Sequence, residues 1–117
     1  MEKVLELARR LGQEIRAHER HRLLREAEKK VMADKDAGKI QDNLETHLLK
    51  MRDLERQMKP IEVADKRELS RLQDLARSNP SLQVLLKVQA DYFEMMDKVN
   101  STILGELAVS PDDDAGN

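Results

Sequence analysis

The chain has 117 residues, a length that suits a single domain, and its charged fraction of 38% nearly equals its hydrophobic fraction of 39%, which indicates long helices with narrow apolar stripes. It has no cysteine, which excludes disulfides, thiolate nucleophiles and cysteine-ligated zinc or iron–sulfur clusters. The net charge of −2 favours neither nucleic acids nor anionic membranes as partners, and no stretch is long and apolar enough to span a bilayer.

Apolar residues recur at intervals of three and four along the whole chain, which is the period of helices and not of strands. The first helix is expected over residues 2–33, and an unbroken helix is favoured because no proline interrupts it. The alternative is a break near residues 18–22, where the apolar face changes direction. At about 100° per residue, the apolar faces of its two halves lie on opposite sides. The first face consists of Val4, Leu7, Ala8, Leu11, Ile15, His18 and Arg22, and the second of Leu24, Ala27 and Val31. We expect one half to pack within the chain and the other against a second chain.

Capping residues predict the next two helices. The second helix is expected over residues 37–58, with Asp34 or Asp36 as its N-cap and Pro60 as its stop. Because its connection to the first helix is short, the two helices are expected to be antiparallel. Asp65 followed by Glu68 resembles a capping box and predicts a third, shorter helix up to about residue 77.

The last helix has the strongest start signal in the chain. Asn79 is a favoured N-cap and Pro80 is favoured at the first helical position, so a helix is predicted from residue 80 to about residue 107. The segment 109–117 is polar and acidic, and we expect a disordered tail there. The predicted fold is therefore all-α, an antiparallel four-helix domain over residues 1–108 that dimerises through its long first, second and last helices.

The expected core is thin, because the chain has only one tyrosine and one phenylalanine. A thin core favours pairing of part of the apolar surface with another chain, as a homodimer, a higher homo-oligomer or a hetero-complex with related helical proteins. The expected interface residues are Leu7, Leu11, Ile15, His18, Phe93, Met96 and Ile103. Phe93, Met96 and Ile103 are also candidates for the core.

The sequence offers little that points to chemistry. A helix would bring Glu14, His18 and His21 to one side, as in helical metal sites, but no further ligand can be assigned and an interface imidazole explains His18 better. Neither a nucleophile elbow nor a glycine-rich phosphate loop is present. We therefore expect no metal, no cofactor and no enzymatic activity.

Basic side chains along the first helix leave a second hypothesis open. They are Arg9, Arg10, Arg16, Arg20, Arg22, Arg25, Lys29 and Lys30. Acidic residues are interleaved with them, so pairs such as Glu6–Arg10 and Glu26–Lys30 make a solvated, ion-paired face the favoured interpretation. The alternative is a regulator that binds nucleic acid through this basic side of the helix.

The order of these features resembles the YlbF/YmcA family of small bacterial helical proteins, the control-of-competence regulator family. The resemblance extends from about residue 4 to residue 107, and it rests on Leu11-Gly12, Leu24, Leu72, Asn79-Pro80 and Val99. It implies a cytoplasmic, non-catalytic adaptor that forms oligomers through its long helices, as an accessory subunit of a regulatory or RNA-processing complex. Some relatives carry cysteines associated with iron–sulfur clusters, a cofactor that this cysteine-free chain does not share.

Overall fold

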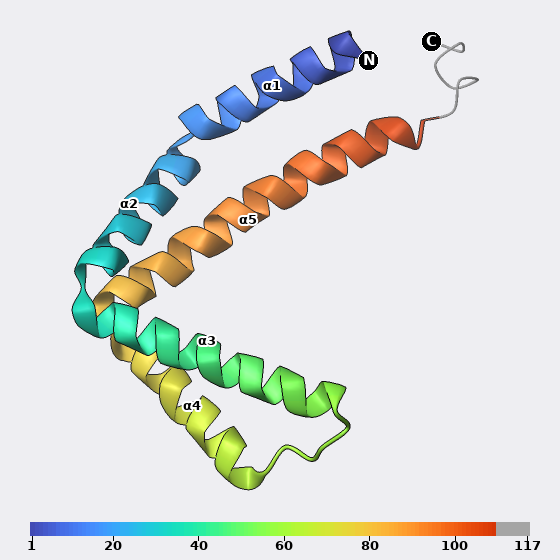
Figure 1. The fold of residues 1–117 in the computed structure, drawn as a ribbon. Coiled ribbons are helices and arrows are strands. Elements are labelled where there is room, and N and C mark those ends of the chain that lie inside the picture. Colours follow the sequence, from blue (N-terminus) through green and yellow to red (C-terminus); the bar gives the residue numbers. More distant parts are fainter. Residues whose placement is uncertain (110–117) are drawn as a thin grey trace.

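The computed structural model describes residues 1–109, and in that part of the chain it contains five α-helices and no strand. The helices are α1 (Glu2–Ala17), α2 (Glu19–Ala33), α3 (Lys35–Arg56), α4 (Val63–Ser78) and α5 (Pro80–Leu107). They form a V (Figure 1): α2 packs along α5 in one arm, with α1 continuing beyond it, and α3 packs along α4 in the other. The all-α prediction is confirmed and the number of four helices is wrong. The predicted tail lies outside the described residues, apart from Val109.

The predicted first helix is two helices, because the chain breaks at His18. The backbone of His18 is extended, with φ −73° and ψ 146°, and its Nδ1 accepts a hydrogen bond of 3.0 Å from the backbone N–H of Arg20, which caps α2. In one continuous helix the apolar stripes of α1 and α2 would face opposite sides. With the break, Leu11 of α1 and Leu24 of α2 both lie on the side of α5.

A second break, at Asp34, makes the corner of the V. Asp34 is the only residue between α2 and α3, and its carboxylate Oδ1 accepts a hydrogen bond of 3.1 Å from the backbone N–H of Ala37. The prediction of Asp34 as an N-cap is confirmed. The predicted antiparallel pairing of the helices on either side is wrong, since an antiparallel helical hairpin needs a loop of about two to five residues. A one-residue link sends α3 into the other arm (Figure 1).

The caps of α4 and α5 were predicted with unequal success. The capping box of α4 pairs Glu62 with Asp65, whose Oδ2 accepts a hydrogen bond of 3.3 Å from the backbone N–H of Glu62. The predicted box of Asp65 with Glu68 is wrong, because Glu68 binds Arg71 one turn further along. At the start of α5, Asn79 Oδ1 accepts a hydrogen bond of 3.1 Å from the backbone N–H of Leu82, as predicted.

A polar cluster holds the α3–α4 arm together. The ammonium of Lys50 donates to Asp65 Oδ1 over 3.0 Å, and the ring Nε2 of His47 donates to the backbone carbonyl oxygen of Asp65 over 2.7 Å. The hydrogen bond from Lys50 is the main cause that holds the pKa of Asp65 below its usual value. Leu72 of α4, 2% exposed, supplies the apolar packing of the same arm.

The main core lies at the vertex of the V, where α2, α3, α4 and α5 meet. Its buried residues are Leu24, Ala27, Val31, Ala37, Ala76, Leu82, Leu85 and Val88. The radius of gyration is 20.4 Å, whereas a compact domain of this length would have about 13 Å. The arms therefore extend well away from a small core. In the described part of the chain, no helix is long and apolar enough to cross a membrane.

Candidate protein-interaction site

Helix α1 carries an apolar stripe that the other described helices leave uncovered. None of its 16 residues is buried, and Val4, Leu7 and Leu11 are 64%, 55% and 38% exposed. A helix of this length is marginal in water on its own, because most helical stability in proteins comes from packing an amphipathic face. Helix α1 thus has the apolar face of a packed helix without a partner for it.

The stripe of α1 faces the last turns of α5 across an open groove. The groove has a volume of about 500 Å³ and separates Leu11 and His18 from α5. The residues that line it are Leu11, His18, Arg20, Met95, Lys98, Val99, Thr102 and Ile103, and we call it the fork. Figure 1 shows α1 and the C-terminal half of α5 as its two prongs. The apolar surface continues beyond the fork on α5, where Leu107 is 75% exposed.

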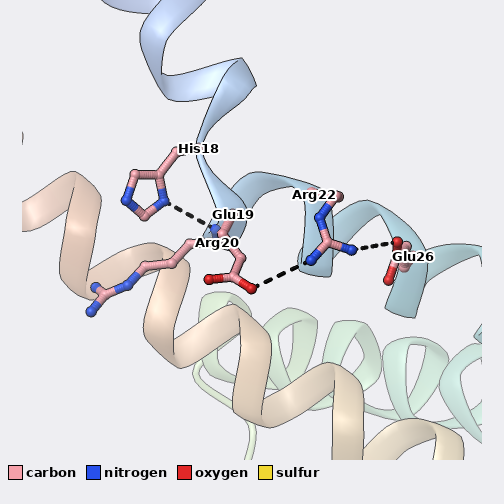
Figure 2. A network of polar contacts seen from close by, with 5 residues as sticks. All are labelled: His18, Glu19, Arg20, Arg22 and Glu26. Carbon is pink, nitrogen blue, oxygen red and sulfur yellow. Dashed lines mark hydrogen bonds and ion pairs between the residues drawn. The ribbon is translucent and has the colours of Figure 1, made fainter.

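The closed end of the fork is fixed by a polar network around the break at His18 (Figure 2). Besides the hydrogen bond to His18, Arg20 sends its side chain to α5, where Nη1 donates to the backbone carbonyl oxygen of Asp91 over 2.9 Å. Arg22 lies between Glu19 and Glu26, with ion-pair distances of 3.4 and 2.7 Å. The first turn of α2 is therefore tied both to the break and to α5.

The electrostatics of the fork come from two cations and one carboxylate on its rim. Lys98 forms an ion pair of 2.9 Å with Glu94, and this hydrogen bond is the main cause that lowers the pKa of Glu94. The positive charge of Arg20 lowers the pKa of Glu94 further. The apolar groove is thus bordered by a charged rim, which is the usual composition of a protein interface.

The structure brings three of the seven predicted interface residues into the fork, namely Leu11, His18 and Ile103. Leu7 and Ile15 lie on α1 outside the fork lining. Phe93 was also a candidate for the core, but its side chain is 57% exposed. Met96 is half-buried on α5 and does not line the fork.

The expected interface residues leave out five residues of the fork. They are Arg20, Met95, Lys98, Val99 and Thr102. The spacing of Met95, Val99 and Ile103, four residues apart, was a usable signal, because such residues share one face of a helix. Lys98 and Arg20 gave no such signal, because charged residues do not belong to an apolar pattern. They line the groove with their long aliphatic stems.

The candidate metal ligands and the basic face also have definite positions. Among the described residues no cluster of histidines and acids could hold a metal ion, and His18 uses its Nδ1 as a cap. The ion pairs expected of Glu6 and Glu26 form with other partners: Glu6 pairs with Arg9 at 3.1 Å, and Glu26 with Arg22. The basic residues of α1 and α2 thus alternate with acids that bind several of them.

A family model described as Control of competence regulator ComK, YlbF/YmcA, matches residues 4–108. No curated protein and no solved structure gave a significant match. The match covers α1 from residue 4 and the other four helices completely.

Proposed function

The chain belongs to the YlbF/YmcA family, control of competence regulator ComK, and on that premise we propose that it is a non-catalytic regulatory adaptor that assembles with a second copy of itself through the fork. The second copy presents the same two apolar stripes, so that two forks close into a symmetric four-helix arrangement. Such an arrangement is self-complementary, as the interfaces of twofold dimers are. Accessory roles in larger regulatory complexes would then belong to the assembled pair.

The observation that carries this proposal is the uncovered stripe of α1. Val4, Leu7 and Leu11 repeat with the spacing of a packed helix, and the break at His18 turns this stripe towards the stripe of α5. The groove between them is unfilled in the single chain. Each apolar side chain that a second copy buried there would contribute about 1.5–3 kcal/mol, which is the right order for a stable contact.

The amount of exposed surface supports the same conclusion. The chain exposes 9445 Å², whereas a compact monomer of this length would expose about 6,500 Å². The excess is larger than the roughly 1,000–2,500 Å² that each copy contributes to an obligate homodimer interface. The open V thus has enough exposed surface for self-assembly.

Hydrogen exchange at two protein concentrations tests where the copies meet. Backbone amides of α1 should exchange more slowly at a concentration where the protein is associated than at one where it is dissociated, because association buries the fork. Amides of α4, which lies in the other arm, should exchange at the same rate in both samples. Equal exchange of α1 at both concentrations, with a change of mass between them, would place the contact elsewhere and overturn the proposal.

A further inference from the structure

Helices α3 and α5 diverge from the vertex of the V (Figure 1), and apolar residues of both line a second surface there. At the vertex, Leu44 of α3 lines a small cavity of about 80 Å³ together with Leu86 and Gln89 of α5. A shallow hollow of about 420 Å³ continues from Leu44 along α3 to Leu48. Because Leu44 lines both, they form one continuous depression. We call it the V groove, defined by Gln41, Leu44, Leu48, Leu49, Leu86 and Gln89.

The leucines of the V groove are exposed to an unusual degree for residues beside a core. Leu48 is 41% exposed, Leu49 is 48% exposed and Leu86 is 52% exposed. Phe93 follows Leu86 after two helical turns and extends the same line along α5. Two rows of apolar side chains on diverging helices form a groove that accepts the apolar face of a third helix.

The charges beside the V groove indicate which kind of helix fits. Asp42 and Glu45 line the α3 part of the groove, and neither forms an ion pair with another described residue. Only Arg52 adds positive charge, at the far end of the hollow. The apolar row is thus bordered by carboxylates that attract cations from outside the chain.

We propose that the V groove docks an amphipathic α-helix of a client protein, with apolar side chains on Leu44, Leu48 and Leu86 and with lysine or arginine side chains beside Asp42 and Glu45. This inference rests on the proposed adaptor function, because self-assembly through the fork leaves the V groove open on each copy. An adaptor needs a client surface separate from its self-assembly surface, and the two grooves lie in different parts of the V.

The test uses two synthetic peptides, each about five helical turns long. Both carry leucine at the positions of one helical face, and the remaining positions are lysine in one peptide and glutamate in the other. The fluorescently labelled lysine peptide should bind the full chain in an anisotropy titration, and the glutamate peptide should bind at least about tenfold more weakly. Equal binding of both peptides, or binding of neither, would overturn the proposal.

Two sets of variants locate the binding. The double variant Asp42→Lys, Glu45→Lys should weaken binding of the lysine peptide by about tenfold. The separate variant Leu48→Asp, which removes an apolar contact of the groove, should weaken binding by more. The matched control is Asp53→Lys with Glu55→Lys, which changes the net charge equally on the same helix but outside the groove. If the control weakens binding as much as the groove variant, the peptide follows net charge alone and the proposal fails.

A measurement of mass separates this proposal from the proposed function. The Asp42→Lys, Glu45→Lys variant should keep the mass of the wild-type assembly while it loses the peptide. A fork variant, Leu11→Glu with Ile103→Glu, should lose the assembly and keep the peptide. If the groove variant instead becomes a monomer, a second copy occupies the V groove and the client proposal is overturned.

Discussion

The guanidinium of Arg20 donates a hydrogen bond of 2.9 Å from its Nη1 to the backbone carbonyl oxygen of Asp91, which ties the first turn of α2 to the middle of α5. Within residues 1–109, no hydrogen bond or ion pair joins α1 itself to α5, so this contact lies at the point where α1 departs from that arm. It therefore holds the first turn of α2, from which α1 departs, against α5.

Replacement of Arg20 tests this link. Arg20→Gln should lower the free energy of unfolding by about 1 kcal/mol, because it removes a charge-assisted hydrogen bond between two helices. The control is Arg22→Gln, which removes only exposed ion pairs within α2 and should change stability by less than about 0.5 kcal/mol. Urea denaturation followed by circular dichroism measures both, and equal losses in the two variants would contradict the assigned role of Arg20.

The cap at His18 gives a second prediction. His18→Ala should destabilise the protein by about 1 kcal/mol, because the backbone N–H of Arg20 loses its acceptor. His18→Asn should stay close to the wild type, since asparagine is a good N-cap. Thermal unfolding of the three proteins decides the matter. An alanine variant as stable as the wild type would contradict the assigned role of His18 as a cap.

The sequence predicted the boundaries that depend on strong local signals. Asn79 and Pro80 form a cap whose geometry needs no distant contact, and α5 begins and ends where expected. His18 is a weak signal by comparison, because histidine is not among the favoured N-caps. The break there is decided by tertiary packing, since it lets Leu11 face α5. Only the change of direction of the apolar stripe near His18 pointed to it.

Some residues of the fork were also predictable from local sequence signals. Leu11 and Ile103 stood out as apolar residues at helical spacing, and they lie on the two sides of the groove. The spacing could not show that α1 and α5 are the helices that face each other. That pairing follows from the one-residue corner at Asp34, which sends α3 away from α2.

The acid side of the pH–stability profile should depend on Asp65. Its pKa is lowered in the folded protein, chiefly by Lys50, so its contribution is complete above the ordinary pKa of an aspartate and is lost as the pH falls through the folded pKa. Asp65→Asn should therefore melt at a lower temperature than the wild type at about pH 6, and the difference should shrink towards about pH 2. Asp53→Asn, which changes an exposed carboxylate of the same arm, serves as the control in the same thermal scans. A difference that stays constant with pH would contradict the assigned role of Lys50.

Binding of RNA separates the adaptor from its alternative. Because Arg9, Arg22 and Arg25 are each paired with a glutamate, we expect no measurable binding of a labelled single-stranded RNA at low salt. The measurement is a filter-binding titration over a series of salt concentrations. Binding that weakens steeply with added salt would show neutralisation of phosphates and favour the nucleic-acid-binding alternative.

The central claim is that two copies meet at the fork, and light scattering after size-exclusion chromatography tests it most directly. At micromolar concentration the wild type should have the mass of a dimer, and Leu11→Glu with Ile103→Glu should have the mass of a folded monomer, because two charges placed in the groove would be buried without partners. The matched control is Met32→Glu with Val63→Glu, which changes two exposed apolar residues outside the fork and should remain a dimer. A monomeric wild type, or a fork variant that stays dimeric, would contradict the account.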